Sequence, residues 1–167
     1  VVLAASLKAP SILIAVDIVE QKLEQAQKLG ATHLINAKDE DPVANILKIT
    51  RSEGVDYAIE SAGKQITMEQ AFRSLRSQGG LCVLAGNLPK GELIAIDPFD
   101  LIKGKQIVGT WGGETKPDED IPEYVNLYFS GKMNLSALIT HEYSLEQINQ
   151  ALEDLEYGKV GRAVVKL

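Results

Sequence analysis

One carboxylate stands out because it directly follows an apolar run. Residues Ile12–Val16 (ILIAV) are mostly β-branched or aliphatic, which is typical of a strand covered on both faces of a parallel sheet. Asp17 comes next, at the carboxyl end of that strand. Ligands of open α/β sheets bind outside these ends, and a carboxylate there can accept both hydroxyls of an adenosine ribose while repelling a 2′-phosphate. Asp17 therefore predicts binding of NAD rather than NADP.

Glycine residues follow three other predicted strands. Gly63, Gly86 and the pair Gly112-Gly113 each come just after an apolar run. A glycine turn at a strand end lets a ligand approach the backbone, so these turns and Asp17 together predict a dinucleotide crevice along one sheet edge. The fingerprint G-x-G-x-x-G does not occur in the sequence, and we expect it immediately before Val1.

Other chemistry is poorly supported. The two histidines, His33 and His141, are more than a hundred residues apart and neither is near Cys82 in sequence, so we expect no metal site within these residues. Tyr128 and Lys132 have the Tyr-x-x-x-Lys spacing of short-chain dehydrogenases. We expect Tyr128 to face the core and Gly131 to end the helix before Lys132. Residues 128–132 are therefore predicted to hold no catalytic residue.

The elements that must position these residues alternate between strand and helix. Predicted strands cover residues 12–16, 32–35, 55–59, 81–85, 93–96, 106–111 and 162–167, with helical patterns between most of them and a brief extended piece at 137–140. Short connections in this order predict an α/β fold, a doubly wound parallel sheet of Rossmann type. Residues 114–120 are expected to form an exposed loop. We expect a dinucleotide-binding domain over residues 1–140 and a terminal helix and strand over residues 141–167.

Composition limits the partners. Of the 167 residues, 45% are hydrophobic and 24% are charged. The net charge of -6 argues against a nucleic acid or an anionic membrane as the binding partner. Lys8, Pro10 and Asp17 interrupt the apolar N-terminus, so we expect neither a membrane span nor a signal peptide. A single cysteine indicates a reducing, cytoplasmic setting. Because the chain opens in the middle of a helical pattern, we expect a fragment.

Seven short stretches together resemble one protein family. They are IAVDI (14–18), KLGATHLIN (28–36), GVDYAIESAG (54–63), the Gly86 turn, GTWGG (109–113), LITH (138–141) and GKVGR (158–162). In these stretches the chain resembles the carboxyl-terminal, coenzyme-binding half of zinc-dependent medium-chain alcohol dehydrogenases. The resemblance covers essentially the whole chain.

The resemblance implies roles for the matching positions. Asp17 would hold the adenosine ribose with help from Lys22, and Arg162 would reach the pyrophosphate. The remaining cofactor-binding residues would be Ile18 and Lys64 beside the adenine, Ala62 and Gly63 in the same turn as Lys64, and Ala85, Gly86 and Trp111 beside the nicotinamide.

The resemblance also implies what lies elsewhere. In the family, a preceding domain carries the catalytic zinc and most of the pocket for the alcohol or aldehyde, and residues 141–167 would pack on it. The family's first strand is absent as well, which would leave two half-sheets with unpaired inner edges. The edge strand Ile107–Trp111 would pair with its own copy, giving a homodimer or tetramer. Two alternatives stay open: a non-enzymatic nucleotide-sensing or interaction module, and a zinc-independent medium-chain reductase.

Overall fold

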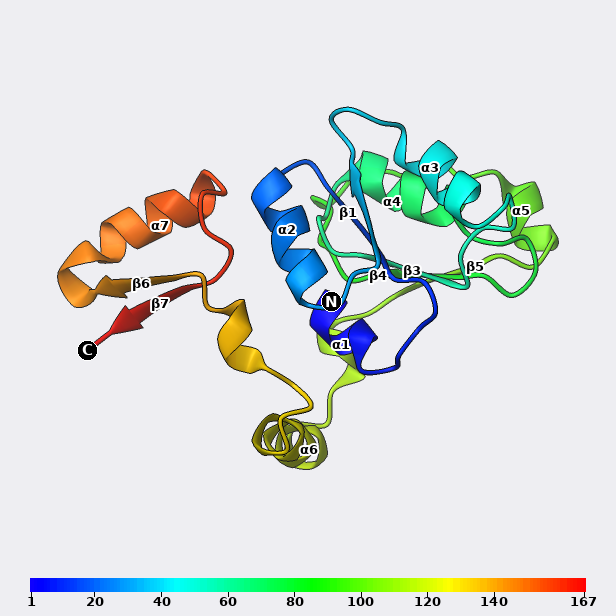
Figure 1. Ribbon diagram of the computed structural model, residues 1–167. Coiled ribbons are helices and arrows are strands. Elements are labelled where there is room, and N and C mark those ends of the chain that lie inside the picture. The colour runs from blue at the N-terminus through cyan, green and yellow to red at the C-terminus, as the bar shows by residue number, and fades with distance from the viewer.

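Seven α-helices and seven strands alternate along the computed structural model, which describes residues 1–167 (Figure 1). The helices are α1 (Val2–Ser6), α2 (Glu20–Lys28), α3 (Pro42–Ile49), α4 (Gln65–Arg73), α5 (Pro98–Ile102), α6 (Pro117–Phe129) and α7 (Ile148–Glu156). The strands are β1 (Ile14–Asp17), β2 (His33–Asn36), β3 (Tyr57–Glu60), β4 (Leu81–Leu84), β5 (Gln106–Gly109), β6 (His141–Ser144) and β7 (Ala163–Lys166). Three 3-10 turns, η1 (Gly112–Glu114), η2 (Leu135–Leu138) and η3 (Leu145–Gln147), complete the chain.

The strands form three separate parallel sheets. β1 pairs with β2, the order β3-β4-β5 makes a second sheet, and β6 pairs with β7. The α/β fold with parallel pairing is therefore confirmed. No ladder joins β1 to β3, so the two half-sheets with unpaired inner edges are also found.

Each of the first two sheets has its own small core. Helix α2 contacts β1 and β2, and its Leu23 and Ala26 are buried with Ala15 of β1. Helix α4 contacts β3 and β4, and its Phe72 is buried with Cys82 of β4. Figure 1 shows α3 and α4 together above the second sheet. The packing of these helices fixes the carboxyl ends of β1, β3 and β4, where the candidate residues lie.

The expectation that Ile12–Val16 is covered on both faces is wrong for this chain. Val16 is 42% exposed, and on the second sheet Tyr57 and Ile59 of β3 are 72% and 46% exposed. Side chains alternate between the two faces of a strand, and α2 and α4 each bury one face, with Ala15 against α2 and Cys82 against α4. On the opposite faces Val16, Tyr57 and Ile59 are exposed, whereas Ile35 of β2, the strand that α3 contacts, is 2% exposed.

Two predictions between β4 and α6 are also wrong. Leu93–Ile96 is not a strand: Ala95 N–H donates to Glu69 Oε1 of α4 at 2.9 Å, so a side chain holds the segment where a ladder was expected. The expected loop 114–120 ends early, because α6 begins at Pro117. Proline at the first helical position and three acidic residues in the first turn favour this earlier start.

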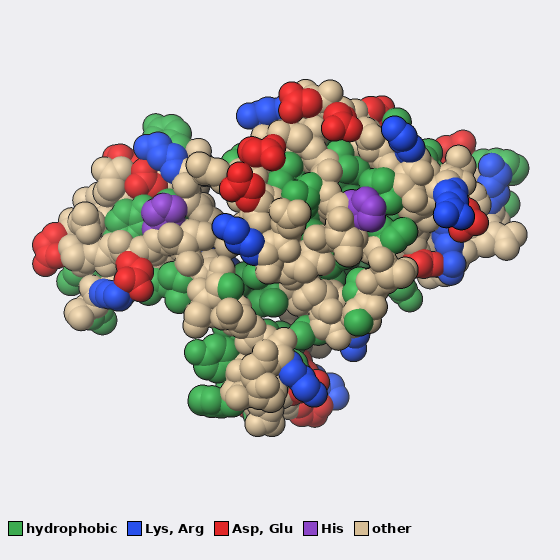
Figure 2. Space-filling view, in the orientation of Figure 1, with side chains coloured by type: hydrophobic (Ala, Val, Ile, Leu, Met, Phe, Trp, Pro, Cys, Tyr) green, Lys and Arg blue, Asp and Glu red, His purple; other side chains and the backbone are tan.

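The carboxyl-terminal elements differ from prediction in two ways. The extended piece expected over 137–140 is mostly the 3-10 turn η2, where Asn134 Oδ1 accepts from Ala137 N–H at 3.2 Å, and the strand β6 follows it. The apolar stripe of α6 was expected to face the core, yet Tyr128 is 41% exposed and no residue of α6 is buried. Figures 1 and 2 show α6 standing away from the sheets with hydrophobic side chains on one side.

The final unit contains β6, β7 and α7. Figure 1 places it to one side of the other two sheets, beyond α2. A capping box of Ser144 and Gln147 lies directly before α7, where Ser144 N–H donates to Gln147 Oε1 at 3.0 Å. Only Ala151 of α7 is buried, so the apolar face of this helix, with Ile148, Leu152 and Leu155, is largely exposed.

Candidate functional site

Asp17 is held at the carboxyl end of β1 by its own turn. Its Oδ1 accepts from Ile18 N–H at 2.8 Å and from Val19 N–H at 3.0 Å, directly before α2 begins. None of the hydrogen bonds within the chain uses Oδ2, and Asp17 forms no ion pair. One carboxylate oxygen is therefore fixed and the other is available to a ligand. Ile18 beside it is 45% exposed.

The turns after β3 and β4 are in direct contact. Gly63 has a positive φ of 68°, and a Cβ added there would lie 2.5 Å from the backbone oxygen of Asn87. A Cβ at Gly86 would lie 2.6 Å from Glu60 Oε2 and would also collide with Gly63 N. Only glycine fits at either position, so Ala62, Gly63, Ala85 and Gly86 form one tightly packed group.

Glu60 lies beneath both turns, and sequence reasoning missed its role. This last residue of β3 is 4% exposed, and its Oε1 accepts from Ala62 N–H at 2.8 Å, Gly63 N–H at 2.9 Å and Thr67 Oγ1 at 2.7 Å. Its backbone oxygen accepts from Ala85 N–H and Gly86 N–H at 2.8 and 3.0 Å. A carboxylate that ends an apolar run and precedes a glycine turn was a visible signal, because Asp17 was selected on similar grounds.

The Glu60 charge also affects a neighbouring thiol. Burial, with a further contribution from the Glu60 carboxylate, raises the pKa of Cys82 to about 11. Cys82 is fully buried and has no disulfide partner. The thiol is therefore protonated at neutral pH and is a small core side chain, with no sign of reactivity.

A cleft of about 480 Å³ opens beside Gly86. Apolar side chains from Met68, Leu84, Leu88, Leu93 and Ile94 line it, together with Gly109 and Thr110 at the end of β5. A Cβ at Gly109 would meet nothing within 4 Å, and Thr110 Oγ1 is buried without a hydrogen-bond partner. Trp111 follows Thr110 and is 87% exposed, so its side chain packs against very little of the chain.

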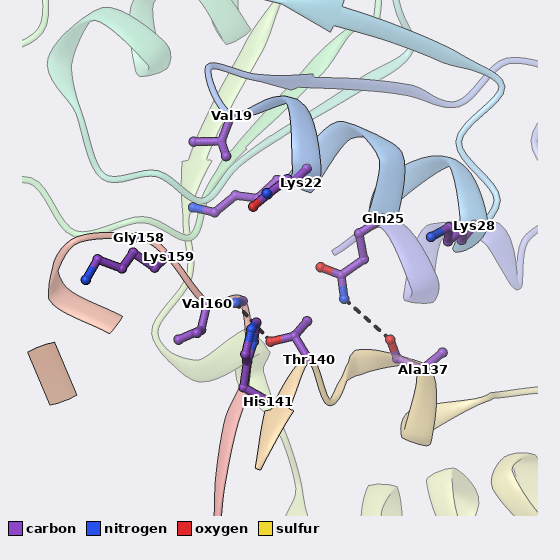
Figure 3. A pocket seen from close by; sticks show the side chains of 12 residues that line it. Val19, Lys22, Gln25, Lys28, Ala137, Thr140, His141, Gly158, Lys159 and Val160 are labelled. Atoms are coloured by element: carbon purple, nitrogen blue, oxygen red, sulfur yellow. Dashed lines mark hydrogen bonds between the residues drawn. The ribbon is translucent and has the colours of Figure 1, made fainter. Parts of the chain in front are cut away.

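A second cleft of about 290 Å³ lies between α2 and the final unit (Figure 3). Lys22 extends into it from α2, opposite Gly158 and Lys159. Across its base Gln25 Nε2 donates to the Ala137 oxygen at 3.4 Å. Arg162 directly follows the lining residue Gly161, and its backbone N–H donates to Thr140 Oγ1 at 2.9 Å. Lys22 and the backbone of Arg162 are therefore brought to the same part of the molecule.

Other predicted residues are more widely distributed. Asp17 and Ile18 lie at the end of β1, in a different sheet from the contacting turns at Gly63 and Gly86. Lys64 is exposed at the start of α4, as its N-cap residue. Arg162 forms no ion pair within the chain. The candidate site therefore spans the two half-sheets.

The residues present do not fit a zinc ion. No three side chains of His, Cys, Asp or Glu come together as metal ligands. The helix α6 ends at Phe129, so Lys132 lies outside it and the Tyr128–Lys132 spacing does not produce a catalytic pair. None of the helices has the length and apolar character that crossing a membrane requires.

Comparison with known proteins identifies close similarity over the whole chain. A sequence model of the family described as zinc-binding dehydrogenase matches residues 1–130. The chain is 33% identical to alcohol dehydrogenase-like 2 of Arabidopsis thaliana over 95% of its length, and 33% identical to alcohol dehydrogenase 2 of Zea mays over 98%. It spans only 42% and 43% of those two proteins.

Solved structures agree with this relationship. Benzyl alcohol dehydrogenase from Acinetobacter calcoaceticus superposes with a TM-score of 0.93 and 40% identity, covering 99% of this chain and 45% of that enzyme. A putative zinc-binding dehydrogenase from Sinorhizobium meliloti, bound to NADP, has a TM-score of 0.87 and 25% identity, covering 99% and 48%. The chain belongs to the zinc-binding dehydrogenase family, within the zinc-dependent medium-chain alcohol dehydrogenases.

Proposed function

We propose that this chain is the coenzyme-binding part of an NAD-dependent alcohol dehydrogenase. The observation that carries the proposal is Asp17, a carboxylate at a strand end with Oδ1 fixed by two N–H groups and Oδ2 unused. Glycine turns at the ends of the neighbouring strands β3 and β4 support it. So does the unfilled space beside Gly109, which suits a planar ring close to the backbone.

Each predicted residue has a role in this proposal. Asp17 accepts the hydroxyls of the adenosine ribose, Lys22 assists from α2, and Ile18 and Lys64 border the adenine. Ala62 and Gly63 form the adjoining turn. Arg162 contacts the pyrophosphate. Its guanidinium forms no ion pair within the chain, which supports this role. Ala85, Gly86 and Trp111 orient the nicotinamide, mainly through backbone groups. The bound coenzyme supplies the ring that exchanges a hydride with the substrate.

The preference for NAD follows from charge. A 2′-phosphate at the adenosine ribose would stand against the Asp17 carboxylate, and no positively charged group is paired with that carboxylate to offset the repulsion. The Sinorhizobium meliloti protein binds NADP, so both coenzymes must be tested.

The substrate class is an alcohol or the corresponding aldehyde. The apolar cleft beside Gly86 and Thr110, and the benzyl alcohol dehydrogenase at 40% identity, favour a primary or aromatic alcohol. The catalytic zinc belongs to a domain outside these residues in this proposal, because the ligand set here does not fit one. Cytoplasmic localisation is part of the proposal and rests on the single unpaired cysteine.

Two further features of the whole protein are proposed. Residues 1–140 form the dinucleotide-binding domain, and residues 141–167 pack on the zinc-binding domain, which would cover the exposed Leu152 and Leu155 of α7. A homodimer or tetramer forms through the edge strand at Ile107–Trp111, since β5 pairs on one side only. Sedimentation of the full-length protein as a monomer at micromolar concentration would contradict the second proposal.

Calorimetric titration of the full-length protein with NAD and NADP tests the main proposal. We expect NAD to bind at least about tenfold more tightly, and Asp17→Ala to remove most of that preference. Asp39→Asn, which neutralises an exposed carboxylate in the turn after β2, is the matched control and should leave both affinities unchanged. Equal affinity of the unmodified protein for the two coenzymes would contradict the Asp17 argument, and binding of neither would refute the proposed function.

A further inference from the structure

The buried carboxylate of Glu60 is saturated on one oxygen and unpaired on the other. Oε1 accepts three hydrogen bonds, from Ala62 N–H, Gly63 N–H and Thr67 Oγ1. Oε2 is buried and has no partner. An unpaired oxygen on a buried charged group is costly, and such groups are retained where the surrounding structure depends on them. Its position therefore needs an explanation.

The position of Oε2 explains why the two turns fit so closely. A Cβ at Gly86 would lie 2.6 Å from Oε2, so the carboxylate fills the space that any other side chain at this position would need. The backbone oxygen of the same residue accepts from Ala85 N–H and Gly86 N–H. One residue thus fixes the turn after β3 with its side chain and the turn after β4 with its main chain.

We infer that Glu60 is a positioning residue for the dinucleotide. It sets the spacing between the turn Ala62–Lys64, beside the adenine, and the turn Ala85–Gly86, beside the nicotinamide. This inference rests on the proposed function and assigns a role to a residue that does not touch the coenzyme. Its negative charge matters, because hydrogen bonds to an ionised acceptor are roughly twice as strong as those to a neutral one.

The substitution Glu60→Gln tests whether positioning requires the charge of the Glu60 carboxylate or only its volume. Glutamine has the same shape and keeps one oxygen for the Ala62 and Gly63 N–H groups, but it removes the charge and places an amide group against Gly86. We expect the Kd for NAD to rise at least about tenfold in the full-length protein. AMP would contact the turn Ala62–Lys64 but not the turn Ala85–Gly86, so the spacing between the turns matters less to it and its Kd should rise less than about threefold.

Glu69→Gln is the matched control. Glu69 is also a buried carboxylate, 8% exposed, but its partners are Ala95, Gln65 and Arg73, which lie outside the candidate site. This variant should lower the urea midpoint while leaving the NAD affinity within about twofold. If Glu60→Gln does not fold, Thr67→Val removes one donor to Oε1, and we expect a rise of about threefold in the NAD Kd.

The outcomes distinguish the inference from the proposed function. Unchanged NAD affinity in Glu60→Gln, or an equal loss for AMP and NAD, would overturn the positioning role while the unmodified protein still binds NAD. Failure of the unmodified protein to bind NAD or NADP would overturn the proposed function and the inference with it. A selective loss of NAD affinity supports both.

Discussion

Gly63 and Gly131 provide a matched pair for measuring how tightly the two coenzyme turns are packed. Both have a similar positive φ, 68° and 73°. A Cβ at Gly63 would lie 2.5 Å from the Asn87 backbone oxygen, whereas a Cβ at Gly131 would meet nothing within 4 Å. The backbone penalty for alanine is therefore the same at both positions, and only Gly63 adds a steric collision.

The expected magnitudes follow from these two contributions. The left-handed conformation costs alanine about 1–2 kcal/mol, which is the whole expected loss for Gly131→Ala. Gly63→Ala should lose about 1–3 kcal/mol more, because the collision is with backbone that must move. Urea unfolding of the full-length protein, without coenzyme, gives the free energy of unfolding of each variant. Equal losses in the two variants would refute the close contact between the turns.

Two other predictions concern titratable groups outside the coenzyme contacts. Lys159, Tyr143 and Gln150 donate hydrogen bonds to Asp154 and hold its pKa below the usual value, so this stabilisation is present above the ordinary carboxyl pKa and is lost as pH falls through the folded value. The urea midpoint of the unmodified protein should therefore fall more steeply from about pH 5 to about pH 3 than that of Asp154→Asn; parallel profiles would contradict this. Because the pKa of Cys82 is raised to about 11, roughly one thiol in a thousand is ionised at pH 8, and iodoacetamide should label it only in urea, as mass spectrometry would detect. Rapid labelling of the folded protein would show that the thiol is accessible.

Local sequence signals predicted the elements near the candidate site well. The apolar run before Asp17 was sufficient to predict β1, and the pair Asp41-Pro42 starts α3 through an equally local pattern, since capping and strand patterns depend on neighbouring residues. Asp41 Oδ1 accepts from Val43 N–H at 2.8 Å, as its position before proline predicts. Parallel pairing followed from the alternation of short strands with helices.

The errors arose where distant residues decide the structure. Leu93–Ile96 has the composition of a strand, but the Glu69 carboxylate takes the Ala95 N–H group and no ladder forms. The helix α6 has an apolar stripe that predicts burial, yet Tyr128 is 41% exposed and no residue of α6 is buried. Glu60 had a local signal, a carboxylate between an apolar run and a glycine turn, but its link between the two turns depends on contact between residues more than twenty positions apart.

The division of the sheet has a consequence for how these 167 residues would respond to heat without the strand that the family places between the two half-sheets. The β1–β2 and β3–β4–β5 sheets have separate hydrophobic clusters and share no ladder, so within this segment each can lose its structure independently. A dinucleotide held by Asp17 at one end and by the Gly86 turn at the other would tie their melting together. Coenzyme would then convert two broad transitions into one cooperative transition at a higher temperature.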